Sequence, residues 1–354
     1  MDIPQPLPGV TSQMIQTPRL KMHVLTSGDP AGVPVIFLHG NFSAALYWEE
    51  TMLALPAGFR AIAPDLRGYG WTEDVLIDST RGYRDWSDDL AALMDVMGVE
   101  KAHLVGWSMG AGIIYRFIGD FPARVLSATL ICPVSPFGFG GTKGAEGTPL
   151  FEDHAGSGGG VVNQEFVKRI QAQDRGSDDP NSPRNIINAF YYVPPFRAAR
   201  EEDFLTASLM EKTGPDRYPG DFVPSPNWPF VAPGVHGPVN CWSLKHLKQD
   251  VPDLLAAQPK PPVLWVRGSH DLIVSDTSFF DIANLGKLGN VPGWPGDEVA
   301  PPQPMLQQTR AVLEKYTAAG GSFEEHVIEN TAHSPHIEKP DVFNALFHQF
   351  LKRA

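Results

Sequence analysis

The chain has 354 residues, a length that suits one large domain or two smaller ones. Its 28 Lys and Arg residues stand against 40 Asp and Glu residues, so the formal net charge at pH 7 is −12. This acidic balance disfavours binding to nucleic acids and to anionic membranes, because a protein needs a basic surface to bind either of them. Hydrophobic residues make up 42% of the chain and aromatic residues 10%, which excludes a wholly disordered protein.

The cysteines and the N-terminus bear on metal binding and on the cellular compartment. Cys132 and Cys241 are too few for a disulfide framework, and their spacing matches no common metal site. We therefore expect two reduced, buried thiols, no metal and no cofactor. The first residues show no basic segment followed by an apolar one, and no apolar run approaches the roughly 20 residues of a membrane span. These features predict a cytoplasmic protein.

The first third of the chain alternates between strand and helix patterns. Short apolar runs that end at glycine or polar residues predict buried strands, and apolar residues at helical spacing between them predict helices. Such alternation is typical of a mostly parallel sheet with both faces covered. The predicted strands are residues 33–38, 60–64, 102–105 and 128–132, and the predicted helices are residues 83–97 and 111–121.

The alternation stops after residue 132 and resumes near residue 261. The segment between them shows helical stretches but no strand pattern, and it contains a glycine-rich part (133–160) and a proline-rich part (214–240). We predict an α/β core domain of residues 1–132 and 261–354, with a helical cap at residues 133–260. The remaining predicted elements are helices at 162–173, 183–193, 201–212, 242–256 and 341–351, and strands at 263–266 and 323–328.

Residues 106–110, Gly-Trp-Ser-Met-Gly, lie between a predicted strand and a predicted helix. A serine on such a sharp turn has a strained backbone, and glycines two residues to either side avoid collisions. The turn raises the Ser108 hydroxyl above the sheet, where the N-terminus of the following helix stabilises negative charge. This strand–turn–helix context makes Ser108 the predicted nucleophile.

Residues 39–42, His-Gly-Asn-Phe, follow an earlier predicted strand. In a parallel sheet this loop opens at the same edge as the predicted nucleophile, where ligands bind. A backbone N–H of this loop, together with that of Met109, can hold an oxyanion. We predict Asn41 as the loop donor, with Phe42 as the second choice. His39 itself is predicted to be a structural hydrogen-bonding residue.

A serine nucleophile needs a base, and the base needs an orienting carboxylate. Asp271 follows the strand at residues 263–266, and His333 follows the strand at residues 323–328. Both loops open at the edge where Ser108 lies, and the chain order Ser, Asp, His is that of the nucleophile-elbow architecture. We predict Asp271 and His333 as the other two catalytic residues. Nearby rivals are Asp276, His270 and His336.

Several motifs together resemble one known family. The chain is similar to the α/β-hydrolase superfamily over nearly its whole length, and in particular to serine-nucleophile members with a helical cap, such as esterases and lipases. The combination of motifs is very specific for that fold. The motifs are His39-Gly40, Trp48, residues 65–70 (Asp-Leu-Arg-Gly-Tyr-Gly), residues 106–110, residues 268–271 (Gly-Ser-His-Asp) and residues 333–340 (His-Ser-Pro-His-Ile-Glu-Lys-Pro).

The resemblance implies a doubly wound, mostly parallel sheet of eight strands with a helical cap inserted after the sixth, which is where residues 133–260 lie. It also implies a Ser-His-Asp triad and structural roles for Asp65 and Arg67. Two departures from the family stand out. Ala332 occupies a position where the family usually has glycine, and an insertion that includes residues 289–296 is expected to form extra cover near the site.

The residue at the elbow narrows the chemistry. Epoxide hydrolases and haloalkane dehalogenases of this superfamily have aspartate there to attack alkyl carbon, whereas serine fits attack on a carbonyl. We predict hydrolysis of a carboxylic ester or lactone through an acyl-enzyme, on a hydrophobic substrate. The alternatives are a C–C bond hydrolase, a perhydrolase, or a non-catalytic ligand-binding receptor of the same fold. Carbon–carbon hydrolases usually have a glycine-rich stretch after His-Gly, where this chain has Asn41-Phe42-Ser43.

Four aromatic residues are predicted to line the substrate pocket. Trp107 is next to the nucleophile, Phe137 and Phe139 lie a few residues beyond a core strand, and Trp228 lies in the proline-rich part of the cap. The glycine-rich part would be the mobile partner of that wall. The expected partner is a small-molecule ester or lactone, and the sequence leaves a homodimer open.

Overall fold

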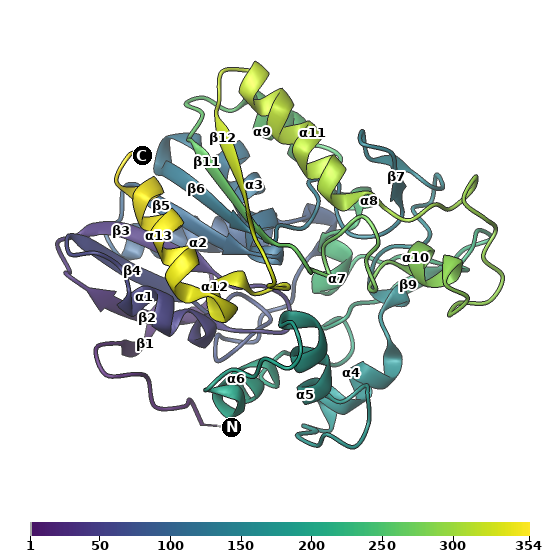
Figure 1. Ribbon diagram of the computed structural model, residues 1–354, viewed down its shortest axis with the longest axis horizontal. Coiled ribbons are helices and arrows are strands. Elements are labelled where there is room, and N and C mark those ends of the chain that lie inside the picture. Colours follow the sequence, from purple (N-terminus) through teal and green to yellow (C-terminus); the bar gives the residue numbers. More distant parts are fainter. Residues whose placement is uncertain (1) are drawn as a thin grey trace.

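The computed structural model describes residues 2–354. At its centre is a sheet of eight strands with helices on both faces (Figure 1). The second strand runs antiparallel to both of its neighbours, and all other neighbouring pairs are parallel, which confirms the predicted fold class. In spatial order the strands are β1 (Thr11–Gln16), β2 (Lys21–Gly28), β4 (Phe59–Pro64), β3 (Val33–Leu38), β5 (Ala102–Trp107), β6 (Val125–Ile131), β11 (Val263–Gly268) and β12 (Phe323–Ile328).

The apolar pattern of the central strands explains why helices cover both faces. In β3, Ile36 and Leu38 belong to one hydrophobic cluster, and Val35 and Phe37 belong to the other. Alternate residues of a strand point to opposite faces, so a continuously apolar strand needs cover on both. The first face is covered by α2 (Arg84–Val96), α3 (Met109–Asp120), α9 (Asp250–Ala256) and α11 (Met305–Ala318), and the second by α1 (Glu49–Leu53) and α13 (Pro340–Leu351).

The segment between β6 and β11 contains the predicted cap helices. They lie beyond one edge of the sheet (Figure 1) and are α4 (Gln164–Gln171), α5 (Pro183–Ile186) with the π-helical turn Ile187–Tyr191, and α6 (Glu201–Ser208). The segment also forms two small hairpins, although the sequence predicts no strand here. They pair β7 (Thr142–Lys143) with β8 (Thr148–Pro149) and β9 (Phe222–Pro224) with β10 (Val231–Pro233). Strands of two or three residues are too short to show an alternating pattern.

The prediction of one continuous helix at residues 242–256 is wrong, because the chain forms separate shorter helices here. The chain forms α7 (Pro238–Cys241), α8 (Leu244–Leu247) and then α9. Pro252 lacks a backbone N–H and is accepted only in the first turn of a helix, so α9 begins at Asp250. Helix α9 packs against α3 of the core. No helix within residues 2–354 is long and apolar enough to cross a bilayer.

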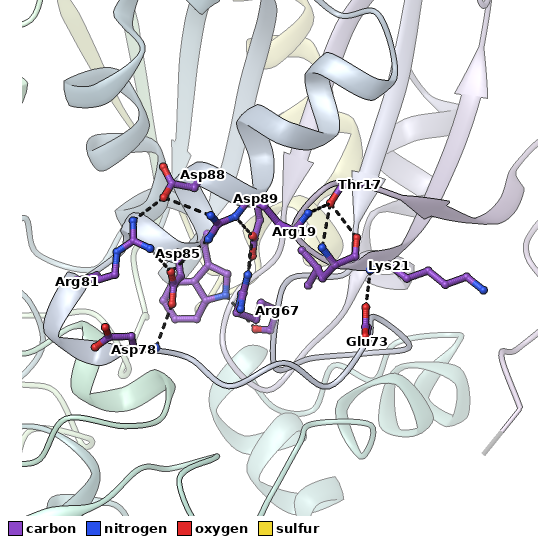
Figure 2. A network of polar contacts seen from close by, with 12 residues as sticks. Thr17, Arg19, Lys21, Arg67, Glu73, Asp78, Arg81, Asp85, Asp88 and Asp89 are labelled. Atoms are coloured by element: carbon purple, nitrogen blue, oxygen red, sulfur yellow. Dashed lines mark hydrogen bonds and ion pairs between the residues drawn. The ribbon is translucent and has the colours of Figure 1, made fainter.

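Buried ion pairs fix the loop that contains Asp65 and Arg67. Arg67 donates hydrogen bonds of 2.7 Å to both carboxylate oxygens of Asp89 on α2, and Arg19 also pairs with Asp89 (Figure 2). Asp65 lies 2.7 Å from His23 Nδ1 and accepts hydrogen bonds from two backbone N–H groups. These contacts give Asp65 and Arg67 the structural roles that the resemblance implies.

Candidate active site

Ser108 occupies a sharp turn between β5 and α3. Its φ of 56° and ψ of −115° are unusual for a residue with a side chain. A Cβ atom at Gly106 would lie 2.6 Å from the backbone of Gly110, and one at Gly110 would lie 2.2 Å from the carbonyl oxygen of Leu38. Both predicted glycines are therefore required by close packing, and the predicted elbow is present.

His333 and Asp271 meet beside this turn. His333 Nδ1 lies 2.9 Å from Asp271 Oδ2, and both side chains are buried. The other oxygen, Asp271 Oδ1, accepts hydrogen bonds from the N–H groups of Ile273 and Val274 at 2.8 and 3.0 Å. With its carboxylate held at both oxygens, Asp271 can fix one tautomer of His333, with the proton on Nδ1 and Nε2 free.

The His333 loop also rests on the elbow. The indole Nε1 of Trp107, the residue before the nucleophile, donates a 2.7 Å hydrogen bond to the carbonyl oxygen of His333. Within residues 2–354, the Ser108 hydroxyl itself makes no hydrogen bond to His333. Nucleophile–base hydrogen bonds in apo structures are often long and tighten when substrate binds. The structure thus brings His333 and Asp271 into direct contact and sets their loop against Ser108.

The rival residues have other surroundings. Asp276 Oδ1 accepts a 2.8 Å hydrogen bond from Leu306 N in the first turn of α11, so this carboxylate caps a helix. The ring of His270 is hydrogen-bonded to its neighbour Ser269 in an exposed turn. His336 packs its ring against Trp48 and other aromatic rings. The structure therefore pairs His333 with Asp271 and not with Asp276.

The predicted oxyanion donors lie on a loop that is held firmly. The hydroxyl of Tyr69 donates to Asn41 Oδ1 at 2.9 Å, and the hydroxyl of Tyr191 donates to the carbonyl oxygen of Asn41 at 2.9 Å. A Cβ at Gly40 would lie 3.1 Å from Ser108 Cβ, so the loop touches the elbow. Within residues 2–354 the backbone N–H groups of Asn41 and its neighbour Phe42 donate to no protein acceptor. Both residues remain candidates for the loop donor.

Met109 and His39 complete this side of the site. Met109 is the first residue of α3, where backbone N–H groups have no partner within the helix. His39 Nδ1 donates to the carbonyl oxygen of Gly40, and its Nε2 accepts from the N–H of Leu66 at 3.0 Å. Burial lowers the pKa of His39 to about 4, so its ring is neutral. The predicted structural role of His39 agrees with these contacts.

The four aromatic residues predicted to line the pocket are not brought together. Trp107 is completely buried, and its indole N–H is bonded to the carbonyl oxygen of His333. Phe137 and Phe139 pack on the cluster beneath α3 and α9. Trp228 packs in a separate cluster with Ala283 and Ala300, and it donates a hydrogen bond to a carbonyl oxygen of the 289–296 insertion. The proline-rich loop folds back onto that insertion, which the spacing of its aromatics did not indicate.

The described structure and two kinds of comparison agree on the family. A family model described as the alpha/beta hydrolase fold matches residues 33–144, which include the His-Gly loop and the elbow. The solved structure of the 2-hydroxy-6-oxo-6-phenylhexa-2,4-dienoate hydrolase of a Rhodococcus strain aligns with 97% of this chain and 99% of its own, with a TM-score of 0.60 and 16% identity. This chain has the α/β-hydrolase fold.

Curated relatives of this α/β-hydrolase match over only part of their length. A protein of Bacillus subtilis (strain 168) named as an uncharacterized carboxylesterase is 26% identical over 181 residues, which cover 48% of this chain and 60% of that protein. Epoxide hydrolase 3 of Siraitia grosvenorii is 38% identical over 112 residues, which cover 31% and 35%. The match thus spans from about a third to three fifths of these two relatives.

Glu338 is a positioning residue of this α/β-hydrolase that the sequence reasoning missed. Its Oε2 accepts a 2.6 Å hydrogen bond from Ala332 N, and its Oε1 accepts one of the same length from Val193 N, which lies between the π-helical turn Ile187–Tyr191 and α6 of the cap. Glu338 therefore ties the His333 loop to the cap. The only signal in the sequence is its place in the 333–340 motif, where it was not assigned a role.

Among residues 2–354, Cys132 forms with Asp271 and His333 a group of side chains that could hold a metal ion. Both cysteines are free and buried, as predicted. Cys132 Sγ and ligand atoms of Asp271 and His333 lie within 4.8 Å of one another, although the three residues are far apart in sequence. This is a set of ligand types that binds Zn²⁺ elsewhere. In the same group His333 Nδ1 is hydrogen-bonded to Asp271, which is the contact that base catalysis requires.

We expect His336 to make the protein less stable in acid. Its ring is buried against Trp48, Trp107 and Phe343, and neither ring nitrogen has a hydrogen-bond partner. Burial lowers its pKa from 6.5 to about 3, so below pH 6.5 the unfolded state binds more protons than the folded state. Stability then falls with falling pH by about 1.4 kcal/mol per pH unit from this group.

The matched variant is His336→Phe, which keeps an aromatic ring and removes the titrating group. The difference in unfolding free energy between variant and wild type, measured in urea, should grow in favour of the variant by about 2 kcal/mol between pH 6.5 and about pH 5. A difference that does not change with pH would show that His336 is not neutral in the folded protein.

Proposed function

We propose that this α/β-hydrolase is a serine hydrolase that cleaves a carboxylic ester or lactone through Ser108, His333 and Asp271. One observation carries the proposal: Ser108 has a strained elbow conformation beside a loop whose histidine is held by a buried carboxylate at 2.9 Å. Strained backbone and an oriented histidine–carboxylate pair together are the requirements of an activated serine.

The proposed reaction has two halves. Ser108 Oγ attacks the carbonyl carbon while its proton passes to His333 Nε2, and Asp271 stabilises the resulting imidazolium. The C–O bond to the leaving group then breaks as His333 returns the proton to the departing alkoxide, which leaves an acyl-serine. Water attacks the acyl-serine with His333 again as base, the acid is released, and Ser108 recovers its proton.

The oxyanion of each tetrahedral intermediate would be held by backbone N–H groups. Met109 N at the start of α3 and the N–H of Asn41 or Phe42 are free to donate to it. Tyr69 and Tyr191 hold Asn41 through its side chain and its carbonyl oxygen. A donor that is already fixed needs no reorganisation when charge develops, which is the source of its catalytic value.

Hydrolysis of a C–C bond is the second candidate. It is favoured by the likeness in fold to the dienoate hydrolase of the Rhodococcus strain, although the 16% identity carries the fold alone. The loop after His39-Gly40 argues against it, since Asn41-Phe42-Ser43 replaces the glycine-rich stretch usual in such enzymes. Esters therefore remain the preferred substrate class.

A substrate panel tests the proposal. We expect the purified chain to hydrolyse p-nitrophenyl esters with kcat/KM above about 10³ M⁻¹s⁻¹ for its preferred acyl length, somewhat below the usual range for an optimal substrate. A 2-hydroxy-6-oxodienoate, followed by loss of its visible absorbance, should be turned over at least about ten times less efficiently. Turnover of the 2-hydroxy-6-oxodienoate alone would favour the C–C reaction. The absence of turnover with every substrate would favour a binding protein.

A further inference from the structure

Glu211 is a buried acid whose charge has no partner. It lies three residues beyond the end of α6, and only 5% of the residue is exposed to solvent. Neither carboxylate oxygen has a hydrogen-bond partner among the described residues. An isolated buried carboxyl is costly, and burial raises the pKa of Glu211 well above its usual value. Such a group needs either a neutral form or a partner brought by a ligand.

The backbone around Glu211 is attached to the loops of the candidate active site. Ser208 Oγ donates a 2.9 Å hydrogen bond to the carbonyl oxygen of Phe42, next to the oxyanion donors. Lys212 N donates a 2.9 Å hydrogen bond to the carbonyl oxygen of Gly68. Glu211 thus lies in a short cap segment, residues 208–212, that is held down on two loops at the edge of the sheet.

Three buried tyrosines lie close to this cap segment or to the oxyanion loop. Burial raises the pKa of Tyr69, Tyr191 and Tyr218, and the charge of Glu211 adds a smaller increase. Tyr69 and Tyr191 are the residues whose hydroxyls hold Asn41, and Tyr218 N is bonded to the carbonyl oxygen of Lys212 at 3.0 Å. The segment that contains Glu211 therefore lies beside tyrosines that contact the oxyanion loop.

The cationic side chains at the start of α6 and directly after Glu211 are bonded elsewhere. Lys212 Nζ, on the next residue, donates to the carbonyl oxygen of Gly70 at 2.8 Å. Arg200, at the start of α6, pairs with the buried Glu49 and with Asp203. Within residues 2–354 the protein thus places a buried carboxyl without a paired cation in a segment bonded to the loops of its candidate active site.

We propose that Glu211 binds a protonated amine of the substrate, with the rings of Tyr69, Tyr191 and Tyr218 beside it. An ammonium group has three N–H donors, so it can satisfy both free carboxylate oxygens and supply the missing charge. Aromatic rings also attract cations through their faces. The inference rests on the proposed ester hydrolysis and adds to it a substrate class, namely esters that carry an amine.

Matched esters test this inference by steady-state kinetics at pH 7. The substrates are p-nitrophenyl esters of ω-amino acids of increasing length, each compared with the ester that has CH₃ or OH in place of the ammonium. We expect one length at which the amino ester exceeds its CH₃ and OH counterparts in kcat/KM by about 10- to 100-fold, the effect of a charged hydrogen bond. In Glu211→Gln this ratio should fall to within about threefold of one.

Stability provides a readout that a merely structural role would not give. Because Gln has no charge to desolvate, Glu211→Gln should raise Tm at pH 7, whereas loss of a structural contact would lower it. A linear alkylammonium ion should raise the Tm of wild type and not that of Glu211→Gln. Glu165→Gln, on the exposed surface of α4, is the matched control and should behave as wild type in each assay.

The outcomes separate this inference from the proposed function. Hydrolysis of the CH₃ esters without any preference for amines would overturn the role of Glu211 and leave the serine-hydrolase proposal standing. An equal preference for the OH esters would overturn the ammonium in particular. A Tm increase from alkylammonium ions in a chain that hydrolyses no ester would support the amine site and contradict the proposed activity.

Discussion

Replacing Ser108 with alanine should lower kcat for ester hydrolysis by about 10⁴- to 10⁶-fold, the usual effect of removing a triad nucleophile. Without Oγ no acyl-enzyme can form, and only the oxyanion donors and substrate binding are left to assist water. Folding should be unaffected, because the Ser108 hydroxyl makes no hydrogen bond to His333 within residues 2–354 that the change would break. Active-site titration and initial rates, with Tm as the check on folding, measure both.

The control for this variant is Ser177→Ala, which makes the same chemical change on the exposed surface of the cap. It should keep full activity. If Ser108→Ala retained more than about a tenth of the wild-type rate, a level far above the residual activity of triad knockouts, the reaction would not use this serine.

Asp271→Asn should be the second most damaging change, with a loss in kcat of about 10⁴-fold. The amide of the new side chain can donate a hydrogen bond to His333 Nδ1. The ring is then held in the wrong tautomer, with its proton on Nε2, so Nε2 can no longer accept the proton of the serine. The paired variant is Asp276→Asn, whose amide oxygen can still accept the hydrogen bond from Leu306 N, so stability should change little and kcat should stay within a few-fold of wild type.

The two aspartate variants are compared by kcat and by urea unfolding. The account requires different patterns, with activity lost in Asp271→Asn and both activity and stability largely kept in Asp276→Asn. If Asp276→Asn were the inactive variant, the carboxylate that orients His333 in solution would be Asp276, and the contact seen at Asp271 would be incidental.

The sheet could be predicted because its strands are apolar on both faces. The run Val-Pro-Val-Ile-Phe-Leu at residues 33–38 supplies side chains to two hydrophobic clusters, and that requirement is visible in the sequence. Residues 323–328 likewise coincide with β12. The cap was harder to predict, because its hairpins are too short to show an alternating pattern. In addition, Pro252 must lie in the first turn of α9, and this helix packs against the core and not within the cap.

Parts of the candidate site could be predicted where the motif is local. The strained turn at Ser108 needs glycine two residues to either side, so its sequence reveals it. The choice between Asp271 and Asp276 depends on α11, a helix that the sequence analysis did not identify, since only the structure shows that Asp276 caps it. The position after the strand predicted Asp271, with Asp276 as a rival whose helix-capping contact only the structure shows.

The pocket could not be predicted from the spacing of aromatic residues. Trp228 and the insertion cover each other, while residues distant in sequence, such as Phe42, Tyr191 and Tyr218, share one cluster with Trp107. Glu211 has no local signature, because a buried unpaired acid is defined by its tertiary surroundings. A residue of this kind can be identified only from the structure, which shows whether its polar atoms have hydrogen-bond partners.

The central claim, that Ser108 is the activated nucleophile, is tested most directly by covalent labelling. The wild-type chain is treated with a fluorophosphonate, digested, and analysed by peptide mass spectrometry. The account predicts a single adduct, on the peptide that contains Ser108, with labelling abolished in Ser108→Ala and strongly slowed in His333→Ala. A single adduct on a different residue that abolishes ester hydrolysis, or ester hydrolysis that continues in a chain fully labelled at Ser108, would contradict it.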